Sequence, residues 1–405
     1  MSFCRICNNN LVTIHNFGNI ALVGEFFKKK KKIKKYKISL NVCQKCKHVQ
    51  IAEILKRDLL FKNYLWETGV SKSNIDLIKD LSNKLRKYGL NKKKKILEIA
   101  SNDGSFLDYI KKKFHCLVLG VDPAKNLKKL TNKKKITTIV DYFSELLSKE
   151  IFSKYSSFDF IVARNVIAHV SDPNEIFRGA KTLLSKNGIM TLEFPHLLNI
   201  FKYNQYDNIF HEHLGYHTLK SIIDLCKENK LKVFNVELIS SQGGSLRCFI
   251  CRKESKINVS NKVKTILFKE KNAGLFSIKK LMAFRKKILF HIDEMKNLIK
   301  KIKNNKKKIS IYGASGKGQA LLQFCKLDDK LIDYAFDKSK LKQNYYISGT
   351  NIQIKNPKEI KKAKVDFLLL LSWNLKNEII KQEQQFLKEG GKFIVPFPSP
   401  RIISL

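Results

Sequence analysis

Four cysteines near the start of the chain have the spacing of a metal site. They form two Cys-x-x-Cys pairs, Cys4 with Cys7 and Cys43 with Cys46. Each pair presents two thiolates from one tight turn, and two pairs supply the tetrahedral set of sulfur ligands that Zn²⁺ prefers. A redox-active pair in each half is the alternative, but that chemistry is typical of a βαβ context, which residues 1–50 lack. We therefore expect a structural zinc site with no coordination position left for catalysis.

A second group of reactive side chains lies in the sequence FHEHLGYH. His211, Glu212, His213 and His217 fall within a span of seven residues. Histidine titrates near neutral pH and suits general base catalysis, and a neighbouring carboxylate can fix its tautomer. A metal site is the alternative, but the spacing does not match the H-E-x-x-H pattern of zinc proteases. The group favours base chemistry over metal binding.

A third candidate is the stretch KILEIASNDGSF, residues 95–106, which indicates a strand, a small-residue turn and a helix. Glycine in such a turn lets the backbone approach a ligand, and the following helix offers free N–H groups. A second predicted strand ends at Asp122, where a carboxylate can bind both hydroxyls of an adenosine ribose. Because the G-x-G-x-x-G pattern of dinucleotide sites is absent, a cofactor with adenosine but no diphosphate fits better. S-adenosylmethionine (SAM) is the obvious one.

Bringing these groups together requires an α/β scaffold. Between residues 95 and 195, short apolar segments alternate with helix-compatible ones, which predicts a doubly wound parallel sheet. Ligands of such sheets lie outside the carboxyl ends of the strands. Asp141 and Phe143 follow the third predicted strand and would suit the amino group and ring face of adenine. The residues after the fourth and fifth predicted strands include Ala163, Arg164, Asn165, His169 and Glu193.

The C-terminal third contains a second glycine turn. Apolar residues recur every three or four positions over residues 275–303, which predicts a long amphipathic helix. Residues 309–313 then indicate a strand entering a turn that contains Lys317. Gly318 follows where a Walker motif requires Ser or Thr, so backbone N–H groups and Lys317 would instead bind a diphosphate, with a simple tight turn as the alternative. A further predicted strand, residues 331–336, ends just before Asp337.

Length and composition indicate the broad class. At 405 residues, the chain is long enough for two or three domains. No apolar run approaches the roughly 18 residues needed to span a bilayer, and no charged-then-apolar leader opens the chain. We expect a soluble, cytoplasmic protein with no membrane partner, whose nine cysteines are reduced thiols.

The formal net charge of +44 would suit a nucleic-acid partner. Only nine of the 79 basic residues are arginines, however, and the lysines come in runs with few aromatic residues among them. Arginine, and not lysine, supplies planar, bidentate recognition of phosphates and bases. We therefore expect solvated lysines and no nucleic-acid partner, with a field that favours anionic small substrates.

Several segments together resemble the sugar C-methyltransferase family, SAM-dependent enzymes that methylate a carbon of nucleotide-bound ketodeoxysugars. The segments are CRIC…CQKC, LEIASNDGSFL, ARNVIAHVSDP, NIFHEHLGYHTL and QGGSLRCFI, and the likeness continues through the C-terminal third. The resemblance implies a zinc-binding domain over residues 1–70 and a class I SAM methyltransferase domain with a Rossmann-like fold over 71–255. It also implies a second Rossmann-like α/β domain over 256–405, which helps to hold the nucleotide-sugar.

The resemblance implies roles for individual residues on the acceptor side. His213 matches the family's base and Glu212 its orienting partner, with His211 nearby. The family's tyrosine position holds Phe210, so another phenol would have to replace it, unless the substrate differs. The candidate phenols are Tyr64, Tyr206 and Tyr216. The implied substrate site also includes Gly243, Gly244 and Lys317.

The resemblance also implies a set of cofactor-binding positions. They are Glu98, Ala100, Asn102, Asp103, Gly104, Asp122, Asp141, Phe143 and Asn165. The family usually has glycine where this chain has Ala100, a small change that leaves room for SAM but could tighten the pocket around its methionine tail.

The implied chemistry needs no metal ion. A hydrogen on a carbon next to a ketone is acidic enough for a positioned base, and the resulting enolate attacks the sulfonium methyl group of SAM. Three alternatives stay open: methylation of oxygen or nitrogen on another small metabolite, methylation of nucleic acid, and a zinc-stabilised binding protein without activity. We expect a monomer or a weak dimer.

Overall fold

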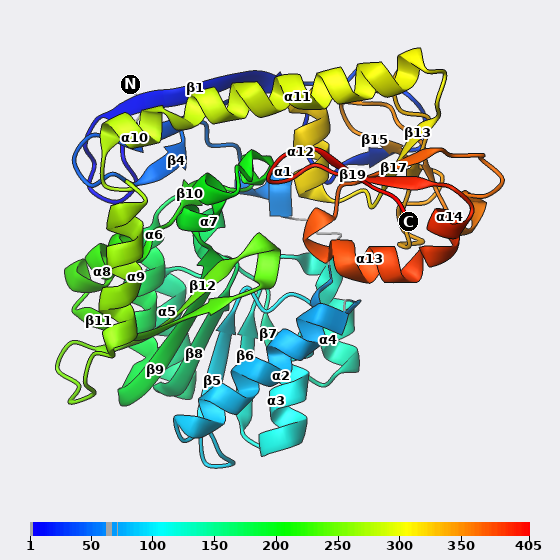
Figure 1. Cartoon of the computed structure of the whole chain (residues 1–405). Helices are drawn as coiled ribbons and strands as arrows, with labels where there is room; N and C mark the ends of the chain where they lie inside the picture. Colours follow the sequence, from blue (N-terminus) through cyan, green and yellow to red (C-terminus); the bar gives the residue numbers. More distant parts are fainter. Residues whose placement is uncertain (1–2, 62–66, 71) are drawn as a thin grey trace.

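The computed structural model describes residues 3–61, 67–70 and 72–405. These residues form sheets of seven, six and four strands and one two-stranded sheet. In Figure 1 the seven-stranded sheet lies below, the four-stranded sheet and the long helix α11 lie above it, and the six-stranded sheet lies to the right. The predicted α/β architecture is therefore present, with two separate α/β sheets.

The seven-stranded sheet has the order β11-β12-β9-β8-β5-β6-β7. Strands β9, β8, β5, β6 and β7 are parallel, and β12 runs antiparallel to both of its neighbours. Its strands are β5 (Lys95–Ile99), β6 (Leu117–Val121), β7 (Thr138–Ile139), β8 (Phe158–Arg164), β9 (Leu184–Pro195), β11 (Leu231–Ile239) and β12 (Ser245–Arg252). The carboxyl ends of five parallel strands thus meet at one edge.

Helices cover both faces of this sheet because its strands are apolar on both sides. Ile96 and Phe160 pack with α2 and α3 on one face, and Leu97 and Ile161 pack with α5, α6 and α8 on the other. Side-chain caps mark the beginning of several helices. The Asp172 side chain, for example, accepts the Asn174 N–H at the start of α6. The helices are α2 (Lys72–Lys87), α3 (Ser105–Phe114), α4 (Lys128–Lys133), α5 (Glu145–Tyr155), α6 (Pro173–Leu183), α8 (Leu219–Glu228) and α9 (Asn261–Asn272).

The N-terminal sheet contains a strand from the middle of the chain. Its order is β1-β3-β4-β10, with every pair antiparallel. The elements of this region are β1 (Leu11–Ile20), β2 (Phe26–Phe27), β3 (Tyr36–Cys43), β4 (Val49–Ile51), α1 (Arg57–Phe61) and β10 (Gly215–Tyr216). Strand β10 follows the histidine segment directly, so the sheet that carries the cysteines also holds the residues after His213.

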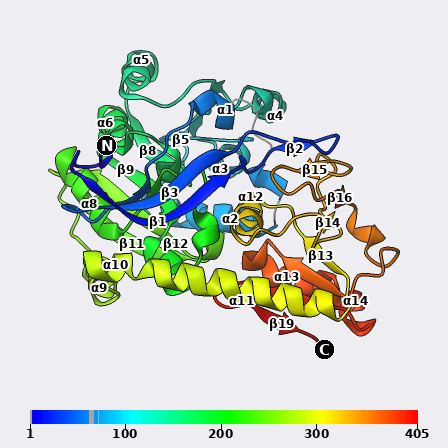
Figure 2. The same ribbon diagram turned by 90° about the horizontal axis from the view of Figure 1, so that it is seen from above.

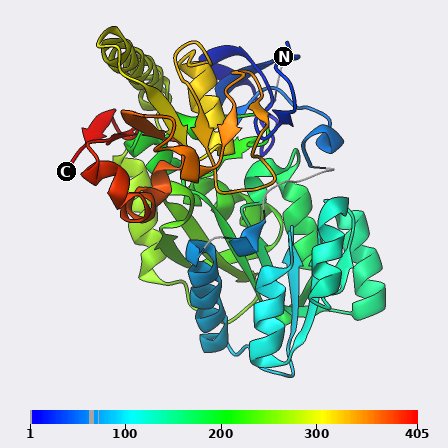
Figure 3. The same ribbon diagram turned by 90° about the vertical axis from the view of Figure 1, so that its right-hand side faces the viewer.

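The C-terminal sheet has the order β16-β14-β13-β17-β18-β19, parallel except for β19. Figure 2 shows α11 running from the N-terminal sheet to the C-terminal sheet. In Figure 3 these two sheets lie above the seven-stranded sheet. The short strand β15 pairs with β2 of the N-terminal region. The elements are α10 (Ile278–Met282), α11 (Phe284–Asn304), β13 (Ile309–Tyr312), α12 (Gly316–Phe324), β14 (Ala335–Phe336), β15 (Tyr346–Ile347), β16 (Ile354–Lys355), β17 (Phe367–Leu370), α13 (Lys376–Gln382), α14 (Gln384–Lys388), β18 (Lys392–Val395) and β19 (Arg401–Ile403).

Two predicted elements differ from the structure. The single helix predicted for residues 275–303 is two helices, α10 and α11, which meet at Ala283, and the first begins only after the Ser277 cap. The strand predicted for residues 331–336 is reduced to β14, because the preceding residues form a turn whose N–H groups bond to the Asp328 carbonyl. Among the described residues, no helix combines the length and apolar character needed to cross a membrane.

Candidate functional site

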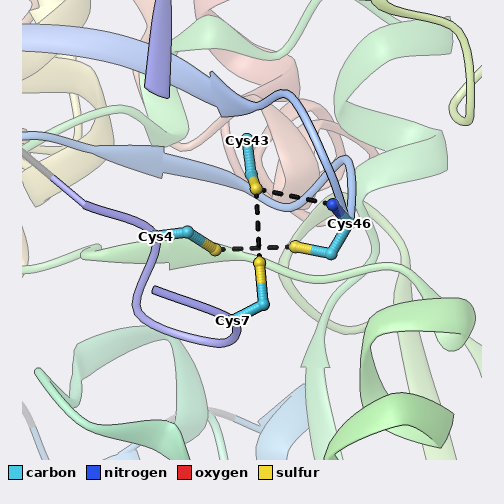
Figure 4. A group of neighbouring side chains, drawn as sticks. All are labelled: Cys4, Cys7, Cys43 and Cys46. Carbon is cyan, nitrogen blue, oxygen red and sulfur yellow. Dashed lines mark hydrogen bonds between the residues drawn. The ribbon is translucent and has the colours of Figure 1, made fainter. Parts of the chain in front are cut away.

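The four N-terminal cysteines converge on one point (Figure 4). Their Sγ atoms all lie within 4.8 Å of one another, and the Cys4–Cys46 and Cys7–Cys43 Sγ atoms are each 3.5 Å apart. A tetrahedron of thiolates around Zn²⁺ has sulfur atoms about 3.8 Å apart, given Zn–S bonds of about 2.3 Å. The four-cysteine group therefore fits a closed zinc site that joins the chain before β1 to the β3–β4 turn.

The turn after β5 has the backbone shape that a close cofactor contact needs. Ala100, Asn102 and Gly104 all have positive φ, at 56°, 51° and 72°. The Asn102 N–H donates to Asp122 Oδ2 at 2.7 Å, and the Ala124 N–H donates to Asp122 Oδ1 at 2.9 Å. The Asp122 carboxylate is thus fixed at the end of β6 beside the turn, and burial raises its pKa.

Two side chains of the same turn hold the segment that leads into α2. Asn102 Oδ1 accepts the Thr68 N–H at 2.9 Å, and Asp103 Oδ2 accepts the Gly69 N–H at 3.1 Å. The Asp103 carboxylate also pairs with Lys134 Nζ at 3.1 Å. The structure therefore assigns Asp103 contacts that organise the turn itself, whereas a contact with the cofactor stays a prediction.

Glu98 and Asn165 place polar atoms at the ends of the adjacent strands β5 and β8. Glu98 Oε1 accepts hydrogen bonds from Arg164 at 2.7 and 3.1 Å, and burial raises the pKa of the Glu98 carboxyl to about 7. Glu98 Oε2 and Asn165 Oδ1 are buried without a hydrogen-bond partner among the described residues. Two buried acceptors without partners fit a ligand that carries donors, as the ammonium and hydroxyl groups of SAM do.

The residues after β7 differ in their surroundings. Asp141 is exposed, whereas Phe143 is buried at 7 % exposure within the hydrophobic core. The Phe143 ring lies 2.7 Å from the position that a Cβ on Gly179 would occupy, so it packs closely against α6. Packing is the role of Phe143 that the structure shows, and its contact with adenine stays a prediction.

The His213 ring is buried and is fixed by a hydrogen bond through Nδ1. Nδ1 lies 2.7 Å from the Asn208 carbonyl oxygen, and the rings of Phe210 and His169 have centroids 4.1 and 4.8 Å from it. Because a carbonyl only accepts, Nδ1 carries the proton and Nε2 is left as an acceptor. Burial lowers the pKa of His213 well below 6.5, and the nearby His169 and Lys317 lower it further.

The neighbours of His213 point elsewhere. His211 Nε2 donates to the Lys37 carbonyl on β3 at 3.1 Å, so this ring belongs to the contact with the N-terminal sheet. The Glu212 Oε1 atom lies 3.8 Å from where a Cβ on Gly24 would stand. The hydrogen bond that fixes the His213 tautomer comes from the Asn208 carbonyl, and the orienting role of Glu212 stays a prediction.

The candidate replacements for the missing phenol are mostly engaged. Tyr206 lies in a short 3-10 helix, Tyr206–Asn208, and its hydroxyl is buried 3.0 Å from His291 Nδ1 on α11. The Tyr216 hydroxyl donates to the Asn208 carbonyl at 3.4 Å, and burial raises its pKa well above 10. Tyr206 thus contacts α11, its role towards a substrate stays a prediction, and Tyr64 lies outside the described residues.

Two C-terminal side chains reach the His213 region. Lys317 Nζ, at the start of α12, donates to the Gln242 carbonyl at 2.8 Å, and Trp373 Nε1 donates to Asp207 Oδ2 at 2.7 Å. Burial lowers the pKa of Lys317 to about 8, against the opposing charge of Asp207. The Asp207 carboxylate, next to Asn208, is itself buried, which raises its pKa. A cation, a carboxylate and a base thus meet between the two α/β domains.

The predicted glycines form the turn between these parts. Gly243 and Gly244 have φ values of 89° and 117°, which favour glycine. A Cβ on Gly243 would lie 2.7 Å from the Trp373 ring, and one on Gly244 would lie 2.3 Å from the Asn199 side chain on α7 (Leu197–Lys202). Gly243 therefore permits close approach of Trp373 from the C-terminal domain, and Gly244 permits close approach of α7.

Comparison with known proteins agrees with this geometry. Residues 4–61 match a family described as a zinc-binding domain, residues 69–236 a methyltransferase domain, and residues 240–398 a C-methyltransferase C-terminal domain. The chain is 30 % identical over 406 residues to the C-methyltransferase NovU of Streptomyces niveus, covering 99 % of this chain and 96 % of that protein. The chain belongs to the family of SAM-dependent sugar C-methyltransferases.

Two solved structures similar to this methyltransferase each cover less than half of the chain. A SAM-dependent methyltransferase from Anabaena variabilis is 15 % identical, covers 45 % of this chain and 86 % of its own, and has a TM-score of 0.38. The magnesium protoporphyrin IX methyltransferase of Synechocystis with bound S-adenosylhomocysteine is 13 % identical, covers 46 % and 90 %, and has a TM-score of 0.36.

The enzyme is a SAM-dependent methyltransferase with a class I Rossmann-like domain, a zinc-binding domain and a C-terminal α/β domain. Its structure brings several predicted cofactor positions together at the strand ends: Glu98, Ala100, Asn102, Gly104, Asp122 and Asn165. Sequence reasoning missed Asp207, Asn208 and Trp373. Their only signals were polar residues directly before the histidine segment and a tryptophan after the apolar LLLLS run.

Proposed function

We propose that this methyltransferase methylates a carbon next to a ketone on a nucleotide-linked deoxysugar, with His213 as the base. The observation that carries this proposal is the state of the His213 ring. Its Nδ1–H is held by the Asn208 carbonyl and its pKa lies well below 6.5, so the ring is neutral at physiological pH with Nε2 as acceptor. Among the described residues, no hydrogen bond engages Nε2.

The reaction needs a base and an electrophile placed on either side of one carbon. His213 Nε2 takes the proton from that carbon, and the electron pair of the C–H bond forms an enolate with the ketone oxygen. SAM supplies the electrophilic methyl group, which the enolate carbon takes while the electron pair of the S–CH3 bond stays on sulfur. The ketone re-forms, and the imidazolium returns its proton to solvent. The Asn208 carbonyl stabilises that imidazolium because Nδ1–H donates to it in both protonation states.

Lys317 supports an anionic acceptor. Lys317 belongs to the first turn of α12, where a helix N-terminus favours anions, and its ammonium reaches the Gln242 carbonyl. A pKa near 8 leaves the ammonium mostly protonated at neutral pH. We assign Lys317 to the diphosphate or to the enolate oxygen, since Phe210 cannot offer the phenol found in the family.

The domain layout follows the same proposal. Residues 1–70 would form the zinc-binding domain, 71–255 the SAM domain, and 256–405 the domain that holds the nucleotide. Supporting this layout, the Trp373–Asp207 and Lys317–Gln242 hydrogen bonds join the last two beside His213. The acceptor would thus lie where the two α/β domains meet.

Deuterium exchange tests the proposal without requiring methyl transfer. The enzyme is incubated in D2O with S-adenosylhomocysteine and a panel of nucleotide-linked 4-ketosugars, and mass spectrometry follows deuterium at the carbons next to the ketone. We expect exchange with at least one sugar and loss of exchange in His213→Asn. When SAM replaces S-adenosylhomocysteine, the sugar should gain one methyl group.

The alternative chemistry gives a different pattern. An enzyme acting on oxygen or nitrogen of a small metabolite would bind SAM in calorimetric titration yet catalyse no carbon–hydrogen exchange with any ketosugar. Exchange that persists in His213→Asn would remove His213 as the base while keeping the reaction class.

A further inference from the structure

The residue after the proposed base is held by two different domains. The Leu214 N–H donates to the Ala168 carbonyl of the SAM domain at 2.6 Å. The Leu214 carbonyl accepts two hydrogen bonds from the zinc-binding region, from the Ile51 N–H at 3.1 Å and from Arg5 NH1 at 2.7 Å. The His213 ring is therefore held by Asn208, and the backbone one residue later is held by the hydrogen bonds of Leu214.

Arg5 lies inside the first Cys-x-x-Cys turn, between two of the zinc-binding cysteines. Its backbone N–H donates to Gln50 Oε1 at 2.9 Å, and Gln50 Nε2 donates to the Phe3 carbonyl at 3.1 Å. Gln50 belongs to β4, where it pairs with Gly215 of β10. The backbone N–H and the guanidinium of Arg5 are thus bonded to Gln50 of β4 and to Leu214, the residue before β10. The cysteine turn therefore sets the position from which the guanidinium reaches Leu214.

We propose that Arg5 is a positioning residue for His213. Through its bond to Leu214, the zinc-binding turn sets the orientation of the His213 ring towards the substrate. This inference rests on the proposed function of His213. Proton transfer requires a heavy-atom separation within about 2.6–3.2 Å. Displacement of a reacting group by about 1 Å can lower the rate about 100-fold. With the bonds to Ala168 and Ile51, the Arg5–Leu214 bond fixes the backbone directly after His213, and it is the one of the three that comes from the cysteine turn.

A purely structural role would predict something else. If Arg5 only stabilised the N-terminal sheet, its loss would lower the free energy of unfolding and zinc retention and leave the folded enzyme's turnover unchanged. A positioning role predicts loss of kcat in a folded, zinc-loaded enzyme, with SAM affinity unchanged because the cofactor turn lies on other strands.

The test uses three variants of the full-length enzyme. Arg5→Met keeps the apolar stem and removes the donor, Arg5→Lys returns one donor, and Lys45→Gln removes an exposed charge from the second cysteine turn as the control. Each variant is measured for zinc content, for SAM affinity by calorimetry, and for kcat and KM. The His213 tautomer is read from long-range ¹H–¹⁵N spectra of ¹⁵N-histidine-labelled protein, with the signal assigned by its absence in His213→Asn.

We expect Arg5→Met to keep zinc and SAM affinity and to lose about 10- to 100-fold in kcat. Its His213 signals should shift from the single Nδ1–H form towards a mixture, and Arg5→Lys should restore part of both readouts. A kcat within twofold of wild type, or an unchanged His213 spectrum, would overturn the proposal. If Arg5→Met does not load zinc, the same two readouts in Arg5→Lys decide.

The spectrum also separates this inference from the proposed function. If His213→Asn keeps turnover, the base assignment fails, yet the Arg5 variants still report whether the zinc-binding turn controls the His213 ring. If His213→Asn is inactive and the Arg5 variants leave the ring and kcat unchanged, only the positioning role fails.

Discussion

Two regions of this enzyme are built in different ways. The SAM side is the set of predicted cofactor residues at the strand ends, and the acceptor side is the group of residues around His213. On the SAM side, Glu98, Asn102, Asp122 and Asn165 come from consecutive strand ends of one sheet. On the acceptor side, His213 is surrounded by contacts from three parts of the chain. Its ring bonds to Asn208, its neighbour Leu214 bonds to Arg5, and Trp373 anchors Asp207.

This difference shows which site depends on domain assembly. A site at the strand ends forms whenever the sheet forms, because parallel strands end at one edge. The acceptor side forms only when the N-terminal sheet and the C-terminal domain are both in place. Changes at domain contacts should therefore affect methyl transfer more than SAM binding.

Replacing the base should give the largest separation of the two sides. We expect His213→Asn to lower kcat by about 100- to 10,000-fold, because general base catalysis supplies a factor of that size. SAM affinity in calorimetry should stay within about twofold, a difference below about 0.5 kcal/mol. His115→Asn, the same change at an exposed position after α3, serves as control. A parallel loss of SAM affinity would show that the two sides are not separate.

Removing a zinc ligand should affect stability first. Cys43→Ser replaces a thiolate by a poor ligand, so zinc content and the free energy of unfolding should fall together, by on the order of several kcal/mol. Metal analysis and urea titration measure both quantities. Zinc content that remains at one per chain would remove Cys43 from the ligand set.

Loss of the Trp373 contact should have a smaller effect on catalysis than loss of the base. Trp373→Phe removes the hydrogen bond to the buried Asp207 carboxylate, and we expect kcat/KM to fall about tenfold. Tyr312→Phe is the matched control, because it removes a hydrogen bond to Glu383 in the same domain. If both variants lose activity equally, the effect reflects the stability of the domain and not its contact with Asp207.

The two sides should also respond to pH in opposite directions. Burial lowers the pKa of His169 and His217 to about 4, so between pH 4 and 6.5 the unfolded chain binds more protons and stability falls as pH decreases. Burial raises the pKa of Glu98 to about 7, so between pH 4.5 and 7 the folded chain binds more protons and stability falls as pH increases. Urea titrations of Glu98→Gln against wild type across this range should show a steeper rise of stability with pH in the variant. Identical slopes would contradict the raised pKa of Glu98.

The smallest expected effect concerns the cofactor turn. Ala100 has a φ of 56°, a left-handed conformation that costs an L-residue about 1 kcal/mol. Ala100→Gly removes this cost, while glycine loses more chain entropy on folding, so the free energy of unfolding should rise by a net amount of about 0.5 kcal/mol. Ala124→Gly is the control, because Ala124 has φ −75° and should be destabilised. Destabilisation by Ala100→Gly would show that the methyl group packs favourably.

The SAM side leaves clearer local patterns in the sequence than the acceptor side does, for a physical reason. Asp122 and the Asn102 turn could be identified because short strands end where polar residues begin, a local pattern. The zinc site was also local, as two cysteine pairs. The Trp373–Asp207 contact joins residues 166 positions apart, and the Arg5–Leu214 contact joins residues 209 apart. Neither contact has a pattern in the sequence, and the bond from His213 to the Asn208 backbone carbonyl has none either, because every residue carries a carbonyl.

Strand β10 also sets an order for synthesis on the ribosome. The N-terminal sheet gains its last strand only when Tyr216 has been translated. Strand β2 can pair with β15 only after residues 346–347 have been translated. Until then the edge of β4 has no neighbouring strand, and an unpaired edge can associate with other chains. The nascent chain therefore passes through a long period in which the first sheet to be synthesised lacks its last strand.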